Sequence, residues 1–158
     1  MGRIDAALDR EEVVERLYRE QGGRIWRALL AYGADPDIAS DAQAEAFAQL
    51  LRRGGGVRDP ERWVWRAAFR IAGGQLKDRQ WVGGAFPEGA YDLEPNSLEL
   101  AEALQALSSR QRSAVILHYI ADLPVREVAA ILNTTTGTVK VHLSRGRHRL
   151  RELLGEER

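Results

Sequence analysis

The sequence predicts an all-α protein made of two small helical domains joined by a flexible acidic linker, with a helix-turn-helix in the C-terminal domain. Apolar residues recur at helical spacing, and no run of alternating β-branched residues indicates a strand. Glycine, proline and acidic residues interrupt this pattern over residues 80–96. The chain is therefore expected to divide into a domain at 1–79, a linker at 80–96 and a domain at 97–158.

The composition is that of a soluble globular protein, with 44% hydrophobic and 29% charged residues among 158. There is no cysteine, which excludes disulfides and thiolate metal sites and fits a reducing compartment. No apolar run approaches the roughly 20 residues that cross a bilayer. The charged first ten residues do not resemble a signal peptide. We therefore expect a cytoplasmic protein with no membrane partner.

The net charge of zero conceals an uneven distribution along the chain. Residues 79–109 contain five acids and one basic residue, whereas residues 110–158 contain nine basic residues and five acids. Within residues 137–151 there are five basic residues and no acid. This asymmetry predicts a local basic surface for a polyanion.

Three helices are expected in the N-terminal part. The first covers about residues 10–32 and can bend at Gly22-Gly23. Asp35-Pro36 and Asp59-Pro60 each combine a capping residue with a proline suited to a first helical position, so they start the second and third helices. We expect the third helix to place Trp63, Ala67, Arg70 and Ile71 along one stripe, with Trp65 and Phe69 beside it.

Four helices are expected in the C-terminal part. Ser108 and Gln111 form a capping-box pattern, and Pro124 opens a short helix. Asn133 is suited to the left-handed conformation that ends a helix, and Thr135 is suited to cap the last one.

The segment from 125 to 151 is a helix-turn-helix candidate, because a short helix, a tight turn and an arginine-rich helix follow one another. Such a second helix fits the major groove, where its first turns meet base edges and its later arginines meet phosphates. The alternative is an ordinary solvated basic helix. The candidate DNA-binding residues are Thr135, Thr136, Thr138, Lys140, His142, Arg145 and Arg147.

This C-terminal segment resembles the promoter-reading domain of extracytoplasmic-function sigma factors. The family pattern LPxRQR…EIAxxLGxSxGTVKSRLxRAR is matched by residues 104–112, 123–132, 137–140 and 143–147. The GTVK and LSRGR blocks at this spacing carry the resemblance. It implies that the domain reads the −35 promoter element with the residues named above.

The N-terminal half resembles the same family. Asp41, Glu45 and Phe47 fall where the family has its DLVQExF block, although the residues from Ala42 to Ala44 differ from it. The resemblance implies that these three residues bind core RNA polymerase. Residues 63–72 look like the family helix that melts the −10 element. This resemblance implies contacts with the melted non-template strand. The residues that would make them are Arg53, Arg58, Arg62, Trp63 and Arg66.

The resemblance therefore implies a promoter-specificity subunit that binds core polymerase and reads the −10 and −35 elements. The acidic linker is similar to the family segment that enters the polymerase active-site channel, and an anti-sigma factor is a further partner in the family. No cofactor, metal site or enzymatic activity is expected, because no nucleophile has a base partner and the histidines lack ligand spacing. The alternatives are an autonomous dimeric regulator and an interaction module without DNA binding.

Overall fold

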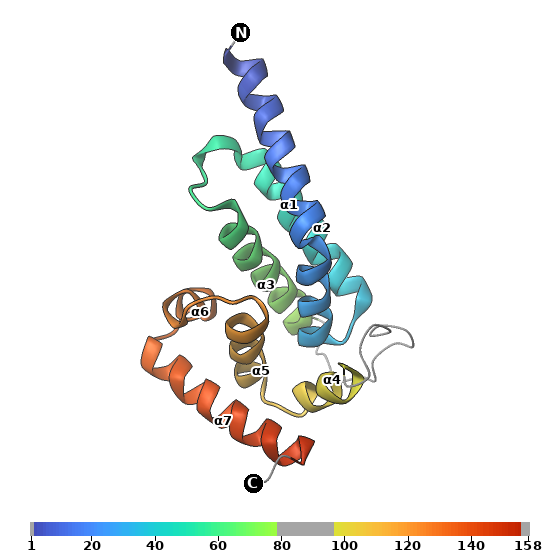
Figure 1. Cartoon of the computed structure of the whole chain (residues 1–158), viewed down its shortest axis with the longest axis vertical. Helices are drawn as coiled ribbons and strands as arrows, with labels where there is room; N and C mark the ends of the chain where they lie inside the picture. The colour runs from blue at the N-terminus through green and yellow to red at the C-terminus, as the bar shows by residue number, and fades with distance from the viewer. Residues whose placement is uncertain (1, 79–96, 156–158) are drawn as a thin grey trace.

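The computed structural model describes residues 2–78 and 97–155, which fold into two adjoining groups of helices (Figure 1). The N-terminal group contains α1 (Gly2–Gly33), α2 (Pro36–Arg53), a 3₁₀ turn (Gly54–Gly56) and α3 (Pro60–Asp78). The C-terminal group contains α4 (Ser97–Gln105), α5 (Ser109–Val115), a π-helical turn (Ile116–Ile120), α6 (Val125–Leu132) and α7 (Thr136–Leu154). These ranges contain no strand, so the all-α prediction is confirmed. The linker predicted at 80–96 lies outside them.

The helix starts follow the capping residues that the sequence indicates. The Asp35 carboxylate accepts hydrogen bonds from the backbone N–H groups of Asp37 and Ile38, at 2.9 and 3.2 Å. The Asp59 carboxylate accepts one from the Arg62 N–H at 3.2 Å. Each aspartate satisfies amides that an α-helix leaves unpaired at its start.

The first helix is longer than the sequence suggests, and it is not interrupted at its glycine pair. It begins at Gly2 rather than near Arg10, and it continues through Gly22-Gly23 without interruption. At Gly22 the absence of a side chain lets the Gln43 amide approach and donate to the Gly22 carbonyl at 2.5 Å. A Cβ at this position would lie 3.1 Å from that nitrogen. The glycine therefore serves the contact between α1 and α2 and not a bend.

The buried stripe of α3 lies beside the predicted one and contains Trp65 and Phe69, which the sequence places next to that stripe. Trp63, Ala67 and Ile71 are half-buried and Arg70 is exposed. The fully buried positions of α3 are Val64, Trp65, Ala68, Phe69, Ala72 and Leu76. Aromatic residues stand on both stripes, so hydrophobicity alone does not choose between them. Packing against α1 and α2 decides the choice, since α3 meets both helices.

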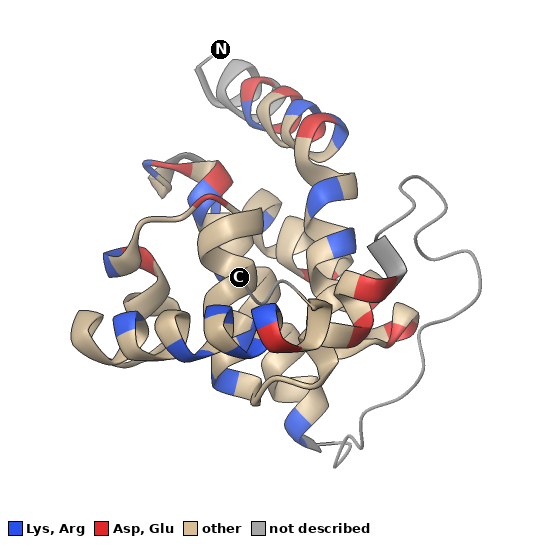
Figure 2. Cartoon of the chain, turned by 60° about the horizontal axis from the view of Figure 1, so that its bottom comes forward, with Lys and Arg blue, Asp and Glu red and all other residues tan. Residues whose placement is uncertain are grey.

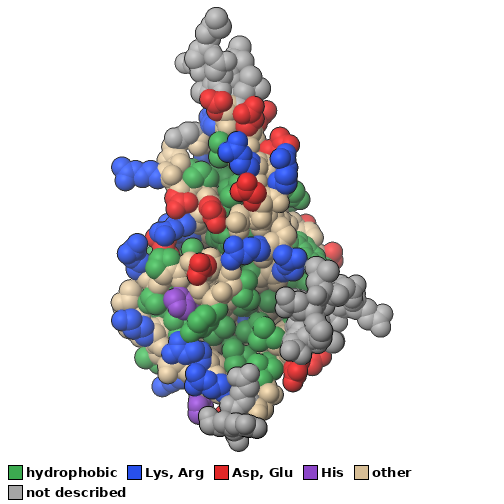
Figure 3. Space-filling model, in the orientation of Figure 1, with side chains coloured by type: hydrophobic (Ala, Val, Ile, Leu, Met, Phe, Trp, Pro, Cys, Tyr) green, Lys and Arg blue, Asp and Glu red, His purple; other side chains and the backbone are tan. Residues whose placement is uncertain are grey.

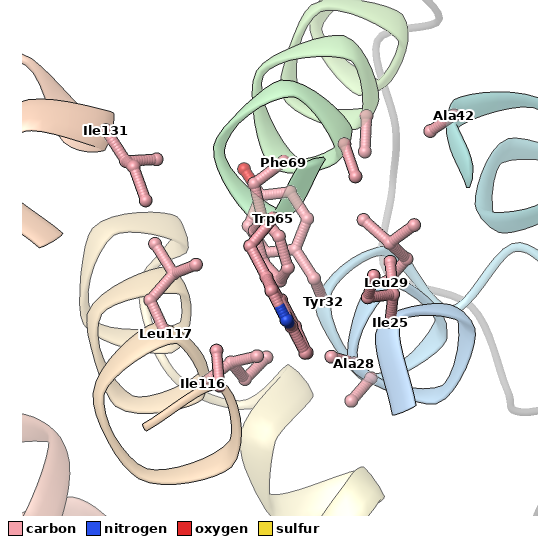
Figure 4. Close-up of a cluster of buried hydrophobic side chains, with 14 of the residues drawn as sticks. Ile25, Ala28, Leu29, Tyr32, Ala42, Trp65, Phe69, Ile116, Leu117 and Ile131 are labelled. Atoms are coloured by element: carbon pink, nitrogen blue, oxygen red, sulfur yellow. The ribbon is translucent and has the colours of Figure 1, made fainter. Parts of the chain in front are cut away.

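The two groups of helices share one apolar core, which the sequence did not indicate. Trp65, 1% exposed, lies where α1, α3 and the C-terminal group meet (Figure 4). Ile116 and Leu117 face it from the other group, and both are fully buried (Figure 4). The described parts of the two predicted domains therefore pack against each other directly.

Hydrogen bonds also join the two groups of helices at this boundary. The Arg24 guanidinium donates to the Ile120 carbonyl at 2.5 Å, and the Gln105 amide donates to the Ala31 carbonyl at 2.5 Å. Both bonds run from side chain to backbone across sequence separations of more than 70 residues. They fix the orientation of α1 relative to α4 and the π-helical turn.

Candidate nucleic-acid interface

The helix-turn-helix is formed by α6, a turn at Asn133–Thr135, and α7. Asn133 ends α6 in the left-handed conformation, with φ of 53° and ψ of 53°, as predicted. Thr135 caps α7, and its hydroxyl accepts from the Thr138 N–H at 3.1 Å. The Thr135 and Thr138 hydroxyls are 2.9 Å apart, so both are engaged in the cap. Each end of the turn thus satisfies its own backbone groups.

The two helices cross closely because the residues between them are small or branched. Val128 on α6 and Val139 on α7 are fully buried, and Leu143 is 3% exposed. Further along α7, Gly146 lies against α5, where a Cβ would come within 2.9 Å of a Val115 methyl. This close approach fixes the position of α7 on the domain.

The charged residues of α7 lie away from this core. Lys140, Arg145 and Arg147 are exposed, as are Thr135 and Thr136, whereas Thr138 and His142 are half-buried. Figure 2 shows basic residues along α7 with few acids among them. Among the described residues, α7 packs mainly on α4, α5 and α6, and its charged side chains face away from them. A helix presented in this way can enter a groove of duplex DNA.

The residues predicted for the −10 element gather at the 3₁₀ turn and the start of α3. Arg53 and Arg58 are exposed, and the Arg53 guanidinium lies over the Trp63 ring at 5.8 Å. Arg62 and Arg66 reach across to Glu127 on α6, with N–O distances of 3.6 and 3.9 Å. The structure therefore brings two of the five residues against the helix-turn-helix, a contact that the sequence does not indicate.

The predicted polymerase-binding residues lie on α2 and differ in accessibility. Asp41 and Glu45 are exposed. Hydrogen bonds from Gln49 and Arg52 lower the pKa of the Glu45 carboxyl. Phe47 is only 5% exposed and packs edge-on against Tyr18, so its side chain does not face solvent in this conformation. Its side chain lies beneath the surface that carries Asp41 and Glu45, so it supports this part of α2 from the buried side.

A buried arginine at the boundary between the two groups escaped the sequence analysis. Arg112 is 5% exposed, donates to the Gln105 side chain at 2.9 Å and lies 5.5 Å from the Tyr32 ring centre. Burial lowers the pKa of its guanidinium. Its burial could have been predicted from its position one turn before Ile116, on the apolar face of the helix that follows Ser108.

Comparison with known proteins identifies the family of this chain. Residues 97–150 match the family model of sigma-70 region 4. The RNA polymerase sigma-E factor of Streptomyces antibioticus is 32% identical over 156 residues, which cover 89% of this chain and 83% of the relative. The extracytoplasmic-function sigma factor SigE of Mycolicibacterium smegmatis is 26% identical over 158 residues, covering 90% of this chain and 62% of the relative.

The chain belongs to the extracytoplasmic-function sigma factors. It is a promoter-specificity subunit of bacterial RNA polymerase, as its sequence predicted. The fold of this sigma factor is also that of the sigma factor RpoE of Bartonella quintana, solved with the anti-sigma factor NepR. The two share a TM-score of 0.73 and 21% identity over 95% of this chain and 99% of the other.

Among residues 2–78 and 97–155, no helix is long and apolar enough to cross a membrane. In the same ranges no three histidine or acidic side chains gather as metal ligands would.

Proposed function

We propose that the two groups of helices divide the work of promoter recognition. Residues 97–158 read the −35 element, residues 1–79 bind core polymerase and read the −10 element, and residues 80–96 connect them. The observation that supports this proposal best is the exposed basic face of α7, held on a buried helix-turn-helix core. In this scheme the protein performs no chemistry of its own and acts in the cytoplasm, where the polymerase works.

The −35 element is read by the first half of α7. Thr136 and Lys140 lie in its first turns and on neighbouring positions of one face, where side chains meet base edges. Arg145 and Arg147 lie further along and bind phosphates, which sets the affinity and its salt dependence. Thr135 and Thr138 hold the helix start in place through their hydroxyls.

The −10 element is read around the 3₁₀ turn. Unstacking a base from duplex DNA costs a few kcal/mol, and aromatic and arginine side chains can offset this cost by stacking and charge. Arg53 over Trp63 forms such a pair at the surface. Arg58 is exposed beside it, and Arg62 and Arg66 join the set once they leave Glu127.

Core polymerase binds at α2. Asp41 and Glu45 stand one turn apart on its exposed face, and both are acidic. Two carboxylates on one rigid helix suit a basic or hydrogen-bond-donating partner surface. Buried Phe47 supports the helix from beneath through its contact with Tyr18.

An anti-sigma protein is a further proposed partner. Among the similar solved structures, the sigma factor RpoE of Bartonella quintana (TM-score 0.73) is in complex with the anti-sigma factor NepR, and CnrH (TM-score 0.68) is in complex with the cytosolic domain of CnrY. We propose that an inhibitory protein also binds this chain and keeps it from the polymerase until the chain is released.

A double charge reversal tests the proposal. Lys140→Glu with Arg145→Glu should abolish promoter-specific run-off transcription, while the variant still co-elutes with core polymerase on size exclusion. The control is Arg16→Glu with Arg19→Glu, the same charge change on exposed positions of α1. Unchanged run-off yield from the α7 variant would contradict the assignment of α7 to promoter reading.

A further inference from the structure

The π-helical turn before the helix-turn-helix carries a tyrosine that contacts α7. Tyr119 is 51% exposed, and its hydroxyl oxygen accepts a hydrogen bond from the Arg147 guanidinium at 2.6 Å. The two residues are 28 positions apart in the chain. No other exposed tyrosine in the described residues has a hydrogen bond that ties it to a basic residue of α7.

The π-helical turn determines where this tyrosine points. The Ala121 N–H bonds to the Ile116 carbonyl, five residues back, at 3.0 Å. This widened turn inserts one extra residue into the helix. Within this turn Ile116 and Leu117 are buried, while Tyr119 stands at the surface on the side of α7.

A second contact holds the tyrosine ring. The His118 ring meets it edge-on, with centroids 4.9 Å apart and planes at 72°. His118 is itself fixed, because its Nδ1 lies 2.8 Å from the Leu123 carbonyl. A carbonyl only accepts, so Nδ1 is the donor. The chain of contacts runs from the backbone at Leu123 through His118 and Tyr119 to Arg147.

Arg147 is the last basic residue in the proposed −35 set. It lies seven positions after Lys140, which is two helical turns, and so on the same face of α7. A guanidinium has five N–H donors, so the bond to Tyr119 leaves others for a phosphate oxygen. An exposed arginine otherwise samples many rotamers and loses that freedom on binding. A side chain that is already held in place loses less conformational entropy when it binds.

We propose that Tyr119 is a positioning residue for DNA binding, which orients Arg147 toward a phosphate of the DNA backbone. The proposal rests on the proposed function, since it takes Arg147 as a phosphate contact. It extends the DNA-binding apparatus to a residue outside the helix-turn-helix. Tyr119 acts through Arg147, because its hydroxyl is bonded to that side chain.

The test uses the full chain and a 30-base-pair duplex of arbitrary sequence, since phosphate contacts do not depend on sequence. Binding constants are measured over a range of salt concentrations. Arg147→Ala should weaken binding and reduce the slope of log K against log salt by about 0.9, the value for one phosphate contact. Tyr119→Phe keeps the ring and every charge, so it should weaken binding about three- to tenfold with little change of slope.

The double variant decides whether Tyr119 works through Arg147. Tyr119→Phe combined with Arg147→Ala should bind no more weakly than Arg147→Ala alone. Tyr18→Phe, at a tyrosine 55% exposed in the N-terminal group, is the matched control and should bind as the unaltered protein does.

The outcomes separate the two proposals. If Arg147→Ala weakens binding but Tyr119→Phe does not, or if the two losses add, the positioning role is wrong and the DNA-binding role of α7 stands. If Arg147→Ala changes neither the affinity nor the slope, Arg147 is no phosphate contact, and both its assignment and the role of Tyr119 are overturned.

Discussion

Glu127, on the first helix of the helix-turn-helix, pairs with Arg62, on the helix proposed to melt the −10 element, at 3.6 Å. The same carboxylate also lies 3.9 Å from Arg66. Figure 3 shows acidic and basic side chains interspersed over much of the N-terminal part of this face, with basic side chains prominent lower down. Glu127 thus adds ion pairs to the hydrogen bonds and the apolar core that join the two groups of helices.

With its two groups of helices packed against each other, the chain cannot reach both promoter elements at once. Elements centred about 25 base pairs apart lie about 85 Å apart along B-DNA. A compact chain of 158 residues has a radius of gyration of about 15 Å. The 18 residues from 79 to 96 can span at most about 65 Å when fully extended, which permits a large separation of the two groups. Under the proposed division of roles, the two groups of helices must therefore part on the promoter.

Glu127→Gln should favour the open arrangement. The change removes both ion pairs, and partly exposed pairs of this kind contribute about 0–1 kcal/mol each. The chain has no cysteine, so Asp37→Cys and Ser144→Cys provide exposed sites for a pair of fluorophores. Energy transfer between them should fall in the Glu127→Gln variant, and the difference should shrink at high salt.

The control for this measurement is Arg126→Gln, an exposed neighbour on α6. It should leave the transfer efficiency unchanged. Equal efficiencies in the Glu127→Gln variant and the unaltered chain would show that the ion pairs do not hold the two groups together.

Gly146→Ala should destabilise the C-terminal group. The new Cβ would meet a Val115 methyl at 2.9 Å, and overpacking costs about 1–3 kcal/mol. This exceeds the roughly 1 kcal/mol that alanine gains over glycine in a helix. Gly137→Ala on the same helix meets nothing closer than 3.9 Å and should be neutral or stabilising. Urea unfolding of both variants checks this, and an equal shift in both would refute the packing argument.

Thr135→Ala should lower the free energy of unfolding by about 1 kcal/mol, because it removes the hydroxyl that caps α7. Thr135→Ser retains a hydroxyl and should restore most of the loss. Thermal unfolding followed by circular dichroism distinguishes the variants. A serine variant as unstable as the alanine variant would mean that the cap is not the cause.

Trp65→Ala should lower the stability of the whole chain by about 3–5 kcal/mol, because this side chain lies in the core shared by both groups. All four tryptophans lie within the first 81 residues, so their fluorescence reports on the N-terminal part. Circular dichroism reports on every helix. The two unfolding curves of the unaltered chain should coincide, and two separate transitions would show that the groups fold independently.

Much of this structure is predictable from local signals. The caps at Asp35, Asp59 and Thr135 and the left-handed Asn133 each depend on residues within a few positions, so the sequence indicates them. The basic face of α7 follows from helical spacing in the same way.

The remaining features depend on contacts between distant segments. The pairing of Arg62 with Glu127 and the bond from Arg147 to Tyr119 join residues 65 and 28 positions apart, which no helical periodicity relates. The π-helical turn also escapes prediction, because its extra residue is fixed by burial of Ile116 and Leu117 and not by a capping residue. The choice of the buried stripe of α3 has the same kind of cause.

The most direct test of the central claim is in vitro transcription of fragmented genomic DNA from the source bacterium by core RNA polymerase, with and without this protein. The 5′ ends of the transcripts are mapped. A discrete set of starts should appear only with the protein, each preceded by shared sequences near −10 and −35. Starts identical to those of core polymerase alone would contradict the claim that this chain selects promoters.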